Sequence, residues 1–163
     1  MKKHLLFLLL AITLLFASCA KKKCCDFPVT KDFIVVQKAG VPAMFNPLSL
    51  AIVQDTFIVS GRNNVAGQEE TFGFRIRLDG LGYYTLKSNE GYYYVTKGNE
   101  KVGTYKLSSA HNNTVIIVSY NGTDKILQGL FDLKYVKIYD SPAGSQPDSI
   151  SFLDGKFKVS LHN

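Results

Sequence analysis

The segment Thr71-Phe72-Gly73-Phe74-Arg75-Ile76-Arg77-Leu78 decides the fold class of this chain. Its large apolar residues occupy every second position, and a glycine and two arginines fill the positions between them. Successive side chains of a β-strand point to opposite faces of the sheet. The alternation therefore predicts a strand with one face in the core and the other in solvent.

The chain beyond residue 31 follows the same pattern. A strand around Phe57 and Val59 is expected to pair with residues 49–53 across Gln54-Asp55. Three dipeptides tolerate positive φ and favour hairpins, namely Asp79-Gly80, Asn121-Gly122 and Asp154-Gly155. The last is expected to divide a strand at 149–153 from a closing strand at 157–161. About ten short strands and no helical periodicity predict an all-β domain, either an antiparallel β-sandwich or a partly open β-barrel.

The amino terminus has the layout of a secretory signal. Lys2 and Lys3 precede an apolar run from Leu5 to Phe16 that only Thr13 interrupts. As a helix this run would rise about 18 Å, which is short of the roughly 30 Å hydrocarbon core of a bilayer. The run therefore fits the apolar region of a signal peptide better than a membrane anchor.

Phe16-Ala17-Ser18-Cys19 resembles a bacterial lipobox. In that class of protein the Cys thiol receives diacylglycerol, the chain is cut before it, and the new amino group is acylated. The resemblance implies cleavage between Ser18 and Cys19, and membrane lipid as the partner that Cys19 contacts through its diacylglyceryl and acyl chains. Ordinary secretion, with cleavage after Ala17 or Ala20, is the alternative.

The chain divides into a signal peptide at 1–18, a flexible tether at 19–30 that begins with the lipidated cysteine, and one all-β domain at 31–163. Cys24 and Cys25 follow Lys23 and each other, so neither has the small preceding residue of a cleavage site. We expect them to be plain tether thiols; intermolecular pairing and further acylation are the alternatives. Their spacing matches no zinc site, and we expect no metal and no cofactor.

The net charge of +6 overstates the basic character of the domain. Lys2, Lys3 and the run Lys21–Lys23 account for much of it, so the domain itself is nearly neutral and gives no basic footprint for nucleic acid. The lysine run could contact anionic headgroups or serve as a solvated spacer.

The sequence gives no sign of catalysis. His111 and His162 stand beside a predicted turn and near the carboxy terminus, and no serine lies in a Gly-x-Ser-x-Gly turn. Glu69 and Glu70 are neighbours, so their carboxylates would point to opposite faces of a strand. We therefore expect no enzyme, with a hydrolase whose site is assembled from scattered residues as the alternative.

Tyrosines cluster between residues 83 and 94. Since consecutive strand residues alternate faces, some of Tyr83, Tyr92, Tyr93 and Tyr94 must point outward. Exposed tyrosines suit stacking on sugar rings or contact with a partner protein, so these four are the candidate ligand-binding residues for a glycan or an envelope protein. The alternative is that they pack on neighbouring strands.

Several short motifs resemble a group of Bacteroidota envelope lipoproteins to which no activity is attached. They are Val36-Gln37-Lys38-Ala39-Gly40, Phe57-Ile58-Val59-Ser60-Gly61, Gly82-x-Tyr84-x-Leu86, the segment 125–131 and Asp154-Gly155-Lys156-Phe157. Met44 or Phe45 stands where the group often has Trp. The resemblance runs from about Asp32 to Leu161 and implies an all-β domain on the outer membrane.

Members of that group that reach the cell surface often carry acidic residues after the lipidated cysteine. This chain has Lys21–Lys23 there, which favours the periplasmic face. Residues and resemblance together predict a lipid-anchored envelope lipoprotein whose domain has a non-enzymatic structural or accessory interaction role. The alternative is a carbohydrate- or protein-binding module that uses the tyrosines.

Overall fold

The computed structural model describes residues 31–48, 50–142 and 146–160. The predicted signal peptide 1–18, the predicted tether 19–30 with Cys19, and residues 161–163 lie outside this part. Among the described residues, no helix is long and apolar enough to cross a membrane. The described chain forms eleven strands: β1 (Phe33–Lys38), β2 (Val41–Pro47), β3 (Ala51–Val53), β4 (Thr56–Val65), β5 (Gln68–Arg77), β6 (Gly82–Thr85), β7 (Gly91–Lys97), β8 (Glu100–Leu107), β9 (Thr114–Asn121), β10 (Ile126–Asp140) and β11 (Ser149–Ser160).

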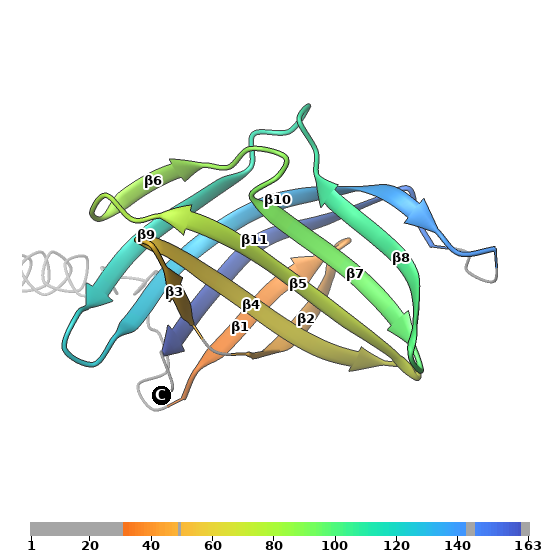
Figure 1. Ribbon diagram of the computed structural model, residues 1–163, viewed down its shortest axis with the longest axis horizontal. Helices are drawn as coiled ribbons and strands as arrows, with labels where there is room; N and C mark the ends of the chain where they lie inside the picture. The colour runs from red at the N-terminus through yellow and green to blue at the C-terminus, as the bar shows by residue number, and fades with distance from the viewer. Residues whose placement is uncertain (1–30, 49, 143–145, 161–163) are drawn as a thin grey trace, which may run out of the picture.

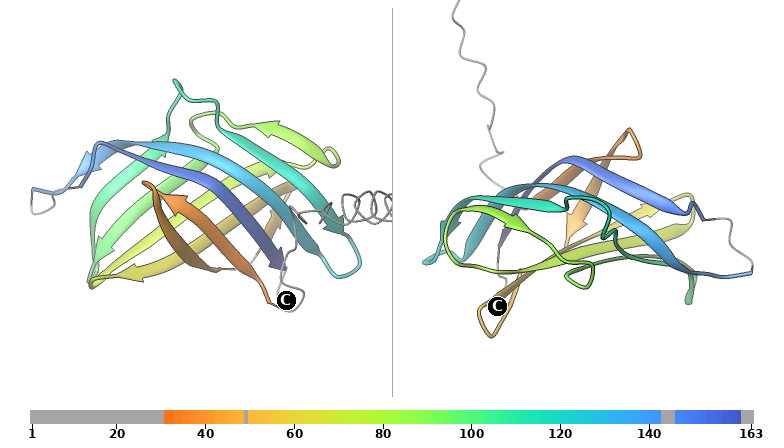
Figure 2. Two further views of the ribbon diagram at one scale, coloured as in Figure 1. Left: turned by 180° about the vertical axis from the view of Figure 1, so that it is seen from behind. Right: turned by 90° about the horizontal axis from the view of Figure 1, so that it is seen from above.

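Eight of the strands close into an antiparallel barrel in the order β11-β1-β2-β4-β5-β7-β8-β10, with β10 returning to β11. Figure 1 shows a front wall of β4, β5, β7 and β8 that crosses a rear wall of β1, β10 and β11. The rear wall faces the viewer in the left view of Figure 2. The all-β prediction is confirmed, and the architecture is a barrel.

The three remaining strands lie beside this ring. β10 is long enough to pair with β9 along Ile126–Asp132 and with β8 along Tyr135–Asp140, while β11 follows its other edge. β6 then pairs with β9. β3 pairs with the start of β4 across the predicted Gln54-Asp55 turn, where φ is 47° and 63° as a two-residue hairpin requires.

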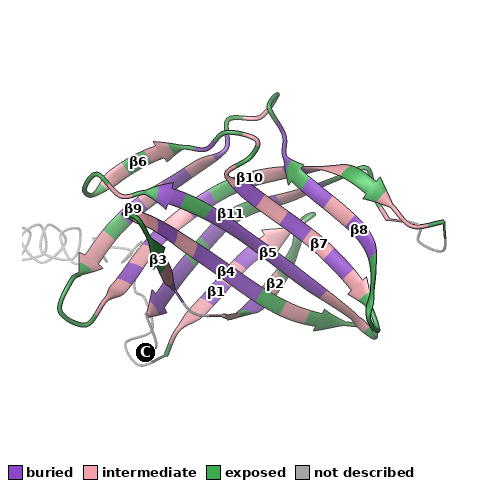
Figure 3. Ribbon diagram, viewed as in Figure 1, coloured by how far each residue is buried: buried purple, intermediate pink, exposed green. Residues whose placement is uncertain are grey.

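The quoted alternation becomes β5. Phe72, Phe74 and Ile76 point into the barrel and are buried, while Arg75 and Arg77 are exposed. Figure 3 shows the same alternation of buried and exposed residues along the neighbouring strands. The inward-facing side chains of all eight barrel strands pack into one continuous cluster, which is the core.

The prediction of a hairpin at Asp154-Gly155 is wrong. β11 runs without a turn from Ser149 to Ser160, and the dipeptide forms a bulge where the pairings with β1 and β10 shift register. Asp154 has a φ of 52°, and a Cβ at Gly155 would lie 2.4 Å from the Phe131 ring. The bulge bends the strand around the aromatic core, which helps the barrel to close.

The prediction of a hairpin at Asp79-Gly80 is also wrong, because β5 and β6 do not pair and these residues form a connecting loop. At Asn121-Gly122 the prediction is confirmed: β9 and β10 pair antiparallel from Asn121↔Ile126. At these three dipeptides the local sequence therefore identified a turn, loop or bulge but not always its type.

A side-chain contact joins the first and last described strands at the end where the chain enters the barrel. The Asp32 carboxylate accepts hydrogen bonds from the Ser160 backbone N–H, at 2.7 Å, and from its hydroxyl, at 2.5 Å. Asp32 is thereby held against Ser160, the last residue of β11.

Candidate functional site on the outer wall

The inside of the barrel is occupied by aromatic side chains. Phe152 lies near the middle, with the ring centroids of Phe45, Phe72, Tyr93 and Tyr135 between 5.2 and 5.7 Å from its own. These residues come from five strands of both walls. A ligand would have to displace this core to enter the barrel, so the outer surface is the place to look for function.

The structure separates the four predicted ligand-binding tyrosines. Tyr93 points inward and is 1% exposed, so it is a core residue and cannot serve as a surface contact. Burial, and after it the nearby Glu70 carboxylate, raise the pKa of Tyr93. Tyr83 is 80% exposed but lies on β6, outside the barrel. Only Tyr92 and Tyr94 come together, on the outward face of β7.

Tyr92 and Tyr94 form a pair of parallel rings. Their planes differ by 17° and their centroids are 6.2 Å apart. Tyr92 is paired with Gly73 of β5, and a Cβ at that glycine would lie 2.5 Å from the Tyr92 hydroxyl oxygen. The missing side chain of Gly73 is therefore what lets the Tyr92 ring extend across β5.

The surroundings of Tyr92 are polar on the side of β4. Burial raises the pKa of Tyr92, and the Ser60 hydroxyl and the Arg75 guanidinium partly lower it again. Ser60 pairs with Gly73, which is also the partner of Tyr92, and Arg75 lies two residues along β5 from Gly73. Lys106 of β8 is the cross-strand neighbour of Tyr92 on the other side.

Tyr94 contacts a basic side chain from β8. The Lys101 ammonium lies 4.8 Å from the centroid of the Tyr94 ring, within the range of a cation–π contact. Thr71 and Thr104 flank Tyr94 on β5 and β8. Each outward tyrosine therefore has at least one basic side chain beside it.

The wall formed by β4, β5, β7 and β8 carries an excess of positive charge. Its exposed basic residues are Arg62, Arg75, Arg77, Lys97, Lys101 and Lys106. The carboxylates of the same strands are Glu69, Glu70 and Glu100. Glu69 lies 3.4 Å from the Arg62 Nε, and Glu70 points inward to Lys38.

Sequence reasoning missed the basic half of this site. The arginines of β5 were recognised as outward-facing, but Lys101 and Lys106 lie in another strand and reach the tyrosines only through the register of β7 with β8. The near-neutral charge of the whole domain gave no sign that one wall concentrates its cations. The sequence did hold one indication of the basic wall, because β4 and β7 contain no acidic residue.

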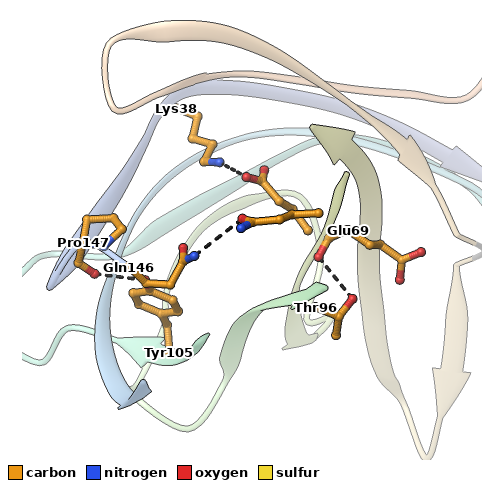
Figure 4. A network of polar contacts seen from close by, with 8 residues as sticks. Lys38, Glu69, Thr96, Tyr105, Gln146 and Pro147 are labelled. Atoms are coloured by element: carbon orange, nitrogen blue, oxygen red, sulfur yellow. Dashed lines mark hydrogen bonds and ion pairs between the residues drawn. The ribbon is translucent and has the colours of Figure 1, made fainter. Parts of the chain in front are cut away.

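A second polar group closes the barrel end at the tips of the β1–β2 and β4–β5 hairpins. Lys38 forms an ion pair with the buried Glu70, and the Lys38 ammonium lies 5.7 Å from the centroid of the Tyr93 ring. The Tyr105 hydroxyl donates to the Pro147 carbonyl oxygen at 2.9 Å. Figure 4 shows these contacts spanning the mouth of the barrel, so we assign them to closing that end.

The opposite end holds a surface cleft of about 700 Å³. Phe57 and Tyr120, whose rings meet edge to face at 5.2 Å, lie in its lining. Asp55, Arg77 and Asp79 are there as well and are exposed. Its charges are of both signs, so the cleft selects less clearly for one kind of ligand than the outer wall does.

The part of the chain that the structure describes holds no group of three or more His, Cys, Asp or Glu side chains placed to bind a metal ion. The comparisons with protein families, with curated proteins and with solved structures found no match to this chain. The chemistry of the site must therefore be inferred from its own residues.

Proposed function

We propose that this protein is a lipid-anchored lipoprotein of the cell envelope whose β-barrel acts as a non-enzymatic interaction module. The packed barrel carries the proposal: aromatic side chains fill the interior, which leaves the outer walls to contact a partner. We place the protein on the outer membrane, on its periplasmic face, as a member of the Bacteroidota group that its motifs resemble.

Two features of the chain support the anchor. Cys19 is the one cysteine that small residues precede, at Ala17 and Ser18. From Cys19 to Asp32 an extended chain spans at most about 45 Å, so a lipid at Cys19 would hold the barrel near the bilayer while leaving its walls accessible.

The test is the membrane association of a Cys19→Ser variant. We expect the natural chain to sediment with membranes and to incorporate a fatty-acid label, because two or three acyl chains hold a protein firmly on a bilayer. The Cys19→Ser chain should lose the label and the membrane association together. A Cys24→Ser/Cys25→Ser variant is the matched control and should keep both. A Cys19→Ser chain that stays labelled and membrane-bound would contradict the anchor.

The second candidate function is a carbohydrate- or protein-binding module, and a specific observation favours it. Tyr92 and Tyr94 form a parallel pair on the outer wall, with Arg75, Lys101 and Lys106 around them. Aromatic side chains beside fixed charges are typical of recognition surfaces. This candidate refines the first, because a lipoprotein can carry out an accessory role by binding.

A further inference from the structure

The outer wall combines aromatic rings with cations, some of which have no acidic partner in the described part of the chain. Of the six exposed basic residues of this wall, Arg62 is next to Glu69, with 3.4 Å between its Nε and the carboxylate. Arg75, Lys101 and Lys106 form no ion pair within the described part of the chain. Their charge is therefore available to a ligand.

The arrangement of these groups is fixed by the barrel. Tyr92 and Tyr94 stand on one strand with their rings parallel, and Lys106 and Thr104 are their register partners on β8. The Lys101 ammonium lies over the Tyr94 ring, and Arg75 is two residues along β5 from Gly73, the register partner of Tyr92. A ligand on this wall would meet aromatic surface at the centre and positive charge on both sides.

We propose that the wall of β4, β5, β7 and β8 binds an acidic polysaccharide. The sugar rings would pack on Tyr92 and Tyr94, and the Lys101 ammonium would move off the Tyr94 ring. The carboxylate or sulfate groups would then pair with Arg75, Lys101 and Lys106. A charged partner also explains why the tyrosines lie beside cations, whereas a neutral glycan would need only aromatic and hydroxyl groups. The wall is an open face of the sheet, so an extended chain of sugars can lie across it.

Single-stranded nucleic acid has a related chemistry, with bases that stack and phosphates that attract cations. The choice of a polysaccharide rests on the proposed function, because export would place the wall among envelope polymers. An anionic bilayer could also attract the cations. A bilayer does not require two tyrosine rings to be parallel, whereas successive sugar rings of one chain do present repeated flat surfaces, so we argue for the polysaccharide and make the other two ligands part of the test.

The test measures binding of an oligogalacturonate to the full lipidated protein in a neutral detergent, by isothermal titration calorimetry. The matched neutral probe is the same oligomer with its carboxylates methyl-esterified. We expect the acid form to bind at least about tenfold more tightly, since exposed ion pairs each add up to about fivefold and several act together. Raising the salt from about 0.05 M to about 0.5 M should weaken the acid form, because the Debye length shortens.

Variants then locate the site. Arg75→Glu/Lys101→Glu should weaken oligogalacturonate binding by about tenfold or more, because two attractive contacts become repulsive. Tyr94→Ala should weaken it by about threefold or more through the lost packing surface. Lys156→Glu, an exposed cation on β11 of the rear wall, and Tyr83→Ala, on β6, are the controls and should bind as the natural chain does.

The proposal fails if both oligomers bind equally or not at all, or if the control variants lose as much affinity as the wall variants. It also fails if an oligothymidylate or phosphatidylglycerol vesicles bind the wall more tightly than the oligogalacturonate does. Failure of the anchor is seen separately, in the fractionation of the Cys19→Ser chain, because that experiment does not involve the wall.

Discussion

Replacing Phe152 with alanine tests whether the barrel interior is a single packed core. Phe152 is 0% exposed and meets Phe45 of β2, Phe72 of β5, Tyr93 of β7 and Tyr135 of β10. Its ring is thus one of those through which the front and rear walls contact each other. Removing it leaves a cavity bounded by side chains from both walls.

The expected loss in the free energy of unfolding is about 4–5 kcal/mol. Truncating a buried Phe to Ala costs about 3–5 kcal/mol, and the cost rises with the volume of the cavity that remains. The upper half of that range applies because the neighbouring rings come from four strands that the hydrogen bonds of the barrel hold in place, so they cannot move in to fill the cavity. For a domain with about 5–15 kcal/mol of stability, this is a large fraction.

The measurement is urea unfolding of the Cys19→Ser chain, followed by far-ultraviolet circular dichroism. With a slope of about 2 kcal/mol per molar urea, the midpoint should fall by about 2 M. Leu153→Ala is the matched control, because Leu153 is the next residue of β11 and is 40% exposed. We expect it to cost under about 1 kcal/mol. If both substitutions cost the same, the interior is not the packed core that the structure describes.

Two further predictions concern close contacts and alkaline pH. Gly129→Ala should lower the free energy of unfolding by about 2–3 kcal/mol, because its Cβ would lie 2.4 Å from the Ile116 carbonyl oxygen. Gly73→Ala should lower it by under about 1 kcal/mol, because its Cβ meets the hydroxyl end of the Tyr92 side chain, which can rotate outward. Equal losses for the two variants in urea unfolding would contradict this prediction. Burial raises the pKa of Tyr93 and of Tyr135, so the folded state holds these protons more tightly than the unfolded state does. The stability that they contribute is complete below a pH of about 10 and is lost as the pH rises above it. Tyrosinate absorbance should therefore appear together with unfolding. Tyr135→Phe should reduce the stability that is lost at alkaline pH.

Much of the fold could be predicted from the sequence because its information is local. The alternation at 71–78 identifies β5 and its inward face without knowledge of any other strand. The β3–β4 hairpin was predictable because two polar residues, Gln54 and Asp55, separate two apolar runs, and in the structure both adopt the positive φ of a two-residue turn. In both cases the deciding property lies within a few consecutive residues.

The closure of the barrel could not be predicted in this way. It depends on the pairing of β10 with β11 and on the bulge at Asp154-Gly155, which has the same sequence signature as a hairpin. A strand continues through that dipeptide because Phe131, far away in sequence, packs against Gly155. Local turn preference cannot report such a contact.

The same limit explains the division of the tyrosines. The sequence establishes that Tyr93 must face opposite to Tyr92 and Tyr94, but either face of the strand could have been the inner one. The contacts of Tyr93 with Tyr105, Tyr135 and Phe152, at 5.1, 5.9 and 5.4 Å between ring centroids, decide it. These partners come from β8, β10 and β11, so the choice depends on the whole barrel.

The register that buries Tyr93 also creates the outer wall. A slip of the register by one residue would turn Tyr92 and Tyr94 inward and would remove the Tyr93 ring from the core. The packing of the core therefore keeps the tyrosine pair on the outer face. The outward direction of the two tyrosines is therefore explained by folding alone, and it is the parallel arrangement of their rings that bears on a ligand. Arg75, Lys101 and Lys106 are different, because the core does not require a cation at any of their outward positions. The case for recognition on this wall thus depends most on its cations, and their reversal is its most direct test.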